Sequence, residues 1–230
     1  IMRRRQRQMC IRDRYKIYEP FIRMAAGFGE ASIKHDKERY EHKYEYCDLL
    51  ITGSGPSGLA SAYAAAKNGA RVILAEDKPR FGGSLLTSDV NIGNQTGVEW
   101  TEKIIAELKS MPNVTVKNRS QVFGYYDHNM LVMSERISDH LPKTQKYLPK
   151  QRLWYIRANE VLISSGSIER PLVFGNNDTP GVMLSSAAKE YMKVYGVLVG
   201  KKPLIFTNND SGYETAIEFK KNGVNPIILD

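Results

Sequence analysis

Three glycines, at Gly53, Gly55 and Gly58, follow an apolar run and precede an alanine-rich segment. Without side chains at these positions, the backbone could turn tightly out of a strand, approach a phosphate and let a helix pack closely. A helix starting near Pro56 would point its free amides at an anion. Glu76 follows 18 residues after Gly58, where an acid could accept hydrogen bonds from an adenosine ribose. The pattern predicts a dinucleotide site; the alternative is a glycine-tight βαβ unit without a ligand.

Two further segments offer backbone to the same ligand. In Phe81-Gly-Gly-Ser84, Gly83 and its neighbour would allow a second close approach to a phosphate or ribose. The strand expected over residues 160–164 runs into Ser165-Gly-Ser167, whose amides could line the cofactor. A tight strand exit without a ligand explains that second turn equally well.

The elements that must position these residues follow an alternating order. Residues 48–76 are typical of a βαβ unit, and Trp100, Ile104, Ile105 and Leu108 recur at helical spacing before Met111-Pro112. A strand is expected over residues 113–117. Three antiparallel strands of a meander are then expected, over residues 121–126, 130–137 and 152–158. The predicted class is α/β, a Rossmann-like FAD/NAD(P)-binding domain with a parallel sheet and a three-stranded antiparallel meander.

A second βαβ unit is expected from residue 203 to the last residue. Its turn, residues 208–212, has one glycine, and Asp210 would repel a pyrophosphate, so we expect a structural unit or a poor nucleotide site. The predicted domains are an N-terminal arm over residues 1–47, a nucleotide-binding domain over 48–196 and the start of an inserted second domain over 197–230. The final strand suggests a piece of a longer protein.

The net charge of +8 is concentrated at one end. Residues 1–14 carry six arginines against one acid, which leaves +3 for the rest. This segment is either a basic arm or a cloning artefact, and no nucleic-acid-binding signature follows it. No apolar run is long enough to span a bilayer, and the two cysteines lack metal-ligand spacing, which fits a reducing cytoplasm. We expect no nucleic-acid partner, no membrane association, no metal and no catalytic residue.

Several runs in this chain resemble a known family. They are Gly53-Ser-Gly-Pro-Ser-Gly58, Phe81-Gly-Gly-Ser-Leu-Leu86, Val122-Phe-Gly-Tyr-Tyr-Asp-His-Asn129, Ile168-Glu-Arg-Pro-Leu-Val-Phe174, Asp178-Thr-Pro-Gly-Val-Met183 and Phe206-Thr-Asn-Asn-Asp-Ser211. Together they are similar to the α subunits of heterotetrameric sarcosine oxidases, from about Tyr15 to Asp230. The glycine motif would suit any flavoprotein with two dinucleotide domains, whereas the runs starting at Phe123 and Phe206 are far more specific.

The resemblance implies a complex with β, γ and δ subunits that oxidises sarcosine to glycine and forms hydrogen peroxide. The one-carbon unit passes to tetrahydrofolate or leaves as formaldehyde. FAD lies on the β subunit, FMN lies between α and β, and the N-terminal dinucleotide domain of α holds NAD. The family's folate-binding region has no counterpart among these residues.

Carried over to this chain, the family's NAD contacts fall on Ser57, Glu76, Asp77, Lys78, Ser84 and Val122. Ser57 stands where the family usually has a smaller residue such as alanine. An acid at Glu76 favours NAD over NADP, while Lys78 and Arg80 oppose that preference if they turn inward. The residues alone do not separate NAD from FAD, because both present an ADP moiety.

Two alternatives remain from the sequence. One is an FAD-dependent oxidoreductase of the pyridine nucleotide-disulfide reductase type, with FAD in the first site. The poor second turn and the lack of a Cys-x-x-Cys motif oppose it. The other is a noncatalytic assembly module with a structural nucleotide, whose partner surface would be formed by tyrosines of the arm: Tyr15, Tyr18, Tyr40, Tyr44 and Tyr46.

Overall fold

The structure is a computed structural model that describes residues 18–27, 29, 33–142 and 147–230. The chain divides into two units, residues 1–38 and residues 39–230. In the first unit, residues 18–25 are helical, and Gly27 follows with a φ of +68°. The predicted segment 1–14, with Tyr15, lies outside the described residues. The second unit contains every predicted site residue.

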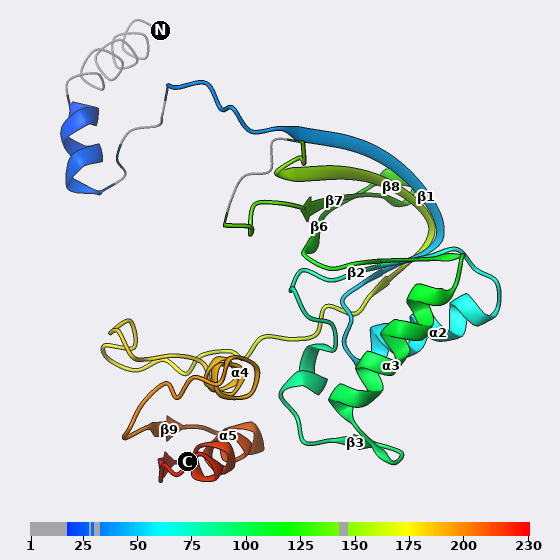
Figure 1. The fold of residues 1–230 in the computed structure, drawn as a ribbon. Helices are drawn as coiled ribbons and strands as arrows, with labels where there is room; N and C mark the ends of the chain where they lie inside the picture. The colour runs from blue at the N-terminus through cyan, green and yellow to red at the C-terminus, as the bar shows by residue number, and fades with distance from the viewer. Residues whose placement is uncertain (1–17, 28, 30–32, 143–146) are drawn as a thin grey trace, which may run out of the picture. The chain divides into compact units, whose positions relative to one another are not determined.

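A six-stranded sheet forms the centre of the second unit (Figure 1). Its strands are β1 (Tyr40–Thr52), β2 (Val72–Ala75), β5 (Val114–Lys117), β6 (Ser120–Tyr126), β7 (Met130–Arg136) and β8 (Gln151–Ile163). Their order is β5-β2-β1-β8-β7-β6, with parallel pairing from β5 to β8 and antiparallel pairing from β8 to β6. The predicted parallel sheet and three-stranded meander are both present.

Strands β1 and β8 are longer than predicted. Residues 40–47, expected in the arm, pair in parallel with residues 151–158, so the sheet starts eight residues before the predicted domain boundary. The two short strands expected at 152–158 and 160–164 are one strand, β8. In residues 40–46 tyrosines alternate with charged residues, which resembles a polar arm. In the structure this segment is part of β1, and the ring of Tyr44 stacks on that of Tyr155 in β8, with the ring centroids 5.0 Å apart.

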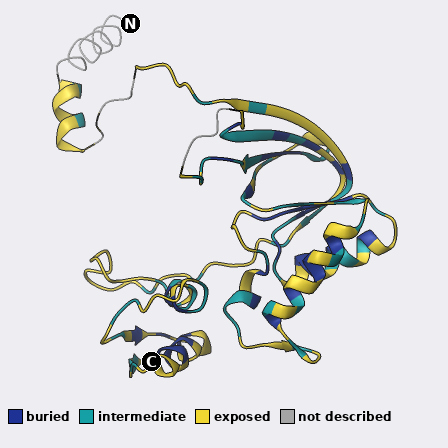
Figure 2. Ribbon diagram, viewed as in Figure 1, coloured by how far each residue is buried: buried dark blue, intermediate teal, exposed yellow. Residues whose placement is uncertain are grey.

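Helices α2 (Pro56–Lys67) and α3 (Gly97–Ser110) lie together against the sheet (Figure 1). Their buried side chains meet those of β1 and β2 in one core cluster: Ile51, Leu59, Ala62, Ala66, Val72, Leu74, Ile104, Ile105 and Leu108. Helix α3 starts at a capping box between Thr96 and Glu99, directly after the hairpin β3 (Asn91–Ile92) and β4 (Gln95–Thr96). Figure 2 shows that each of these helices has both buried and exposed residues along its length. Burial of this apolar stripe fixes α2, and with it the glycine turn at its start.

The meander strands contribute a second core cluster with the other side of β1 and β2. Its buried members are Cys47, Leu50, Ile73, Ala75, Leu131, Met133, Trp154, Ile156 and Ala158. The loop between β6 and β7 contains the short 3₁₀ helix η2 (Asp127–Asn129). Because Ala75 is buried in this cluster, the end of β2 is held from the meander side as well.

The C-terminal elements are α4 (Ser185–Tyr195), β9 (Leu204–Phe206), α5 (Asp210–Lys221) and β10 (Ile227–Leu229). Strands β9 and β10 pair in parallel, which agrees with the predicted βαβ unit. Their core also takes in Ala188 and Met192 from α4. Helix α4 therefore packs with the second βαβ unit, although the predicted boundary at residue 196 placed it in the first domain. No helix among the described residues is both long and apolar enough to cross a bilayer.

Candidate functional site

Two of the three motif glycines are required by the fold itself. Gly53 has a φ of +98°, and a Cβ there would lie 2.3 Å from the carbonyl oxygen of Ser164. A Cβ at Gly58 would lie 2.0 Å from the carbonyl oxygen of Gly53. The first contact places the end of β8 against the glycine turn. The turn at residues 165–167, predicted to line the cofactor, follows directly, and its contact with a cofactor stays a prediction. These glycines would be needed whether or not a nucleotide binds.

Gly55 is different, because neither backbone torsion nor close packing requires a glycine at this position. Its φ of −65° and ψ of −179° are open to any residue, and a Cβ there would meet no atom within 4 Å. Gly55 is the N-cap of α2 and makes no side-chain capping bond, and Pro56 follows it. The exposed Ser57 lies in the first helical turn. Uncapped first-turn amides beside open space form the arrangement that a phosphate group fills.

The second glycine pair supports this turn. The amide of Gly82 donates to the carbonyl oxygen of Ser54 at 3.1 Å and to its Oγ at 3.2 Å. A Cβ at Gly83 would lie 2.9 Å from the Cα of Gly55. The close backbone approach predicted for this loop is therefore made to the first turn, and its approach to a ligand stays a prediction. Ser84 is exposed at the start of the 3₁₀ helix η1 (Gly83–Leu86).

Glu76 is buried at the end of β2, with 6% of its surface exposed. Its Oε2 accepts hydrogen bonds from the amide and the Oγ of Ser54, at 2.9 and 2.5 Å. Its Oε1 accepts from the amide of Lys78 at 3.0 Å. Burial, and then a hydrogen bond with Asp77, raise the pKa of Glu76 against the lowering effect of these donors. No pattern in the sequence predicts Ser54 as the partner of Glu76.

These bonds leave the carboxylate of Glu76 a limited capacity for a ligand. A carboxylate offers about four lone-pair positions. Two face Ser54 and one faces the amide of Lys78, and the hydrogen bond with Asp77 that helps to raise the pKa of Glu76 draws on the fourth. The acid thus orders the glycine turn, and a ribose hydroxyl could donate to it only in place of Asp77.

The remaining predicted residues lie around the end of β2. The carbonyl oxygen of Asp77 accepts from Arg136 Nη2 at 3.0 Å. Lys78 Nζ donates to Glu190 of α4. Val122 is half-buried against the cluster that contains Ala75. Strand β6 reaches this point because the amide of Ser120 donates to the carbonyl oxygen of Glu76 at 2.7 Å.

The turn of the second βαβ unit has the opposite character. The Oδ1 of Asn209, the N-cap of α5, accepts from the amide of Ser211 at 3.0 Å and from its Oγ at 2.5 Å. Asp210 is the acid of the first helical turn. A Cβ at Gly212 would lie 2.6 Å from the side chain of Thr207, so this glycine serves close packing. This helix start is capped by the chain itself and carries a negative charge.

Other reactive groups give no second centre among the described residues. They contain no cluster of three or more acidic, histidine or cysteine side chains that could hold a metal ion. Cys47 is buried, and burial raises the pKa of its thiol to about 12. A thiol with that pKa is uncharged near neutral pH and is a poor nucleophile.

Comparisons with known proteins match the part of the chain that contains this site. A family model described as FAD dependent oxidoreductase matches residues 48–142, the segment with the glycine turn, Glu76 and most of the meander. The α subunit of sarcosine oxidase from Rhizobium meliloti (strain 1021) is 45% identical over 214 residues, covering 93% of this chain and 22% of the relative. The α subunit from Corynebacterium sp. (strain P-1) is 36% identical over 206 residues, covering 89% and 21%.

The chain thus spans about a fifth of the length of the curated relatives it matches. Among solved structures, L-proline dehydrogenase from P. horikoshii superposes with a TM-score of 0.67 at 21% identity, covering 87% of this chain and 38% of that one. This likeness concerns the fold, and it confirms the predicted α/β, Rossmann-like class. The resemblance to sarcosine oxidase α subunits, seen first in the sequence runs, is also confirmed.

Proposed function

We propose that this chain is the NAD-binding portion of the α subunit of a sarcosine oxidase complex. The observation that carries the proposal is Gly55, whose missing side chain leaves open space at the uncapped start of α2. The pyrophosphate would lie there, on the amides of the first helical turn. Glu76 would accept from the adenosine ribose, whose hydroxyl would replace the side chain of Asp77.

The residues at this site bind and orient; they do not carry out the oxidation. NAD accepts a hydride when it acts in redox chemistry. The described residues hold the ADP part of the nucleotide, and we assign no catalytic residue to this chain. In the proposed complex with β, γ and δ subunits, sarcosine is oxidised at the FAD of the β subunit, electrons pass to the FMN between α and β, and oxygen is reduced to hydrogen peroxide. The proposed compartment is the cytoplasm.

A second candidate is FAD in this first site. It is favoured by the match of residues 48–142 to FAD dependent oxidoreductases. The geometry at Gly55 and Glu76 serves either nucleotide, because both carry an ADP moiety. The chain would then be a flavoprotein part of an oxidoreductase, and its bound cofactor would be yellow.

The experiment that separates the two candidates is analysis of the nucleotide that copurifies with the chain. The protein is denatured, and the released compound is identified by its absorbance spectrum and by mass spectrometry. NAD supports the first proposal, and FAD supports the second. If the chain binds neither compound, even when each is added to the purified protein, the nucleotide-binding function is wrong.

Activity provides an independent check of the proposed division of labour. The chain alone, with added FAD and FMN, is expected to form no hydrogen peroxide from sarcosine. Peroxide production by this chain would place the reactive flavin and the substrate within these residues. That result would contradict the assignment of the oxidation to other subunits.

A further inference from the structure

Lys78 is held by a carboxylate from a distant part of the chain. Its Nζ donates to both oxygens of Glu190, at 2.7 and 2.8 Å, across 112 residues of sequence. Glu190 lies in the middle of α4, and Lys78 lies two residues after Glu76, which directly follows β2. The pair is about half exposed on the lysine side and less so on the glutamate side.

The position of Lys78 matters because its backbone is bound to the acid of the nucleotide site. Its amide donates to Oε1 of Glu76, the acid that is proposed to meet the ribose. A basic side chain at this end of a nucleotide site is what accommodates the 2′-phosphate of NADP. Lys78 would therefore be a cation beside the proposed ribose position, and its charge is already paired with Glu190.

We propose that Glu190 is a specificity-determining residue, which positions Lys78 and neutralises it so that the site discriminates against a 2′-phosphate. The inference rests on the proposed nucleotide-binding function and adds to it a residue outside the first nucleotide unit. Glu190 acts through Lys78 and touches no nucleotide itself.

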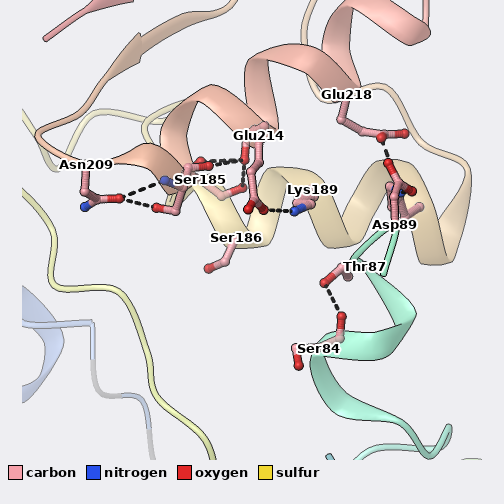
Figure 3. A network of polar contacts seen from close by, with 12 residues as sticks. Ser84, Thr87, Asp89, Ser185, Ser186, Lys189, Asn209, Glu214 and Glu218 are labelled. Carbon is pink, nitrogen blue, oxygen red and sulfur yellow. Dashed lines mark hydrogen bonds and ion pairs between the residues drawn. The ribbon is translucent and has the colours of Figure 1, made fainter. Parts of the chain in front are cut away.

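Other ion pairs hold α4, the helix that carries Glu190, in place. Asp89, in the loop after η1, pairs with Lys193 of α4 and with Lys221 of α5, the latter at 2.5 Å. Lys189 of α4 pairs with Glu214 of α5 at 2.5 Å (Figure 3). Figure 3 also shows Glu218 of α5 above Asp89. The helix that carries Glu190 is thus tied both to the loop after η1 and to α5.

A second cation, Arg136, lies beside the residue before Lys78, because it donates to the carbonyl oxygen of Asp77. An effect of Glu190 on nucleotide choice must therefore be shown to act through Lys78. The test uses Glu190→Gln, which keeps the side-chain shape and removes the charge. Lys78→Gln and the double variant complete a cycle that isolates the pair.

Glu214→Gln is the matched control. It breaks another lysine–glutamate pair of α4 and leaves Lys78 and Glu190 in place. A change caused only by a loosened α4 would occur in this control as well. All variants are studied in the same chain, stripped of nucleotide, with calorimetric titration of NAD and of NADP.

Glu190→Gln is expected to shift the affinity ratio about two- to fivefold toward NADP, the size that one exposed ion pair supports. The shift should be absent in Glu214→Gln and absent when Lys78 is already glutamine. An unchanged ratio in Glu190→Gln, or an equal shift in the Lys78→Gln background, overturns the proposal while NAD binding itself stands. Failure of all the proteins to bind either nucleotide overturns the proposed function, and this inference falls with it.

Acylation of lysines, followed by mass spectrometry, tests the pairing itself without any nucleotide. Glu190 raises the pKa of Lys78 against the lowering effect of burial. Loss of that charge should therefore increase the rate at which Lys78 is acylated, relative to other lysines of the same protein. An unchanged rate at Lys78 would show that Glu190 does not hold it, and would overturn the proposal even where NADP binding had shifted.

Discussion

Replacement of Glu76 by alanine tests whether the acid at the end of β2 holds the glycine turn together. The carboxylate accepts from the amides of Ser54 and Lys78, and it is almost fully buried. Loss of the acceptor leaves two amides without a partner, at about 1–3 kcal/mol each. Burial of the charged form, which raises the pKa of Glu76, offsets part of this loss. We expect the free energy of unfolding to fall by about 2–4 kcal/mol.

The matched control is Glu99→Ala. Glu99 also accepts from a backbone amide and a hydroxyl, those of Thr96, but in an exposed capping box at the start of α3. Water can replace its bonds, so the expected loss is much smaller than that for Glu76→Ala. The assay is denaturant unfolding of nucleotide-free protein for both variants and the wild type. Equal losses in the two variants would show that Glu76 does not order the turn.

The pH dependence of the free energy of unfolding provides a second test of the role of Glu76. Because the pKa of Glu76 is raised in the folded protein, the folded state takes up a proton before the unfolded chain does. The contribution of Glu76 to stability should therefore grow as the pH falls through the raised pKa toward 4.5, the ordinary value. The gap between wild type and Glu76→Ala is expected to widen on mild acidification. A gap that narrows would refute the assigned direction of the shift.

Further outcomes follow from the same structure. Gly55→Val is expected to abolish nucleotide binding with little change in thermal stability, whereas Gly58→Val should unfold the turn; retained nucleotide in the first variant would exclude the pyrophosphate from this position. Asp89 has its pKa lowered to about 2 by two lysines, so its stabilising contribution is present above its ordinary pKa of 3.8 and is lost between these values. Asp89→Asn should remove that part of the acid-induced loss of stability. If stability falls equally with acid in the variant and the wild type, the ion pairs of Asp89 with Lys193 and Lys221 contribute nothing in solution.

The local parts of the site could be predicted from the sequence. The turn at Gly53 and Gly58, the helix after Pro56 and the acid at the end of β2 lie within one short βαβ unit. Their geometry depends on backbone torsion and close packing between neighbours in the chain. The amphipathic helix α3 was equally clear from its apolar spacing, and the structure places it at Gly97–Ser110.

Long-range partners were not predictable. The pairing of residues 40–47 with 151–158 joins segments more than a hundred residues apart, and tyrosines alternating with charges gave no apolar face to recognise. The Lys78–Glu190 pair spans 112 residues in the same way. Ser54 is not recognisable from the sequence, because a serine between two glycines is compatible with many turns. Its role depends on the carboxylate of Glu76, 22 residues along the chain, which accepts a hydrogen bond from its Oγ.

The two βαβ units show which part of a glycine motif indicates a ligand. Both need a glycine where the helix meets the preceding turn, since a side chain at Gly58 or at Gly212 would collide with that turn. Such glycines belong to the fold and say nothing about a nucleotide. Only the first unit adds Gly55, a glycine that neither torsion nor packing requires, and leaves the helix start uncapped. In the second unit Asn209 caps the helix start, and an acid follows it. The contrast supports the proposal that the nucleotide binds at the first βαβ unit and that the second unit is structural and packs with α4.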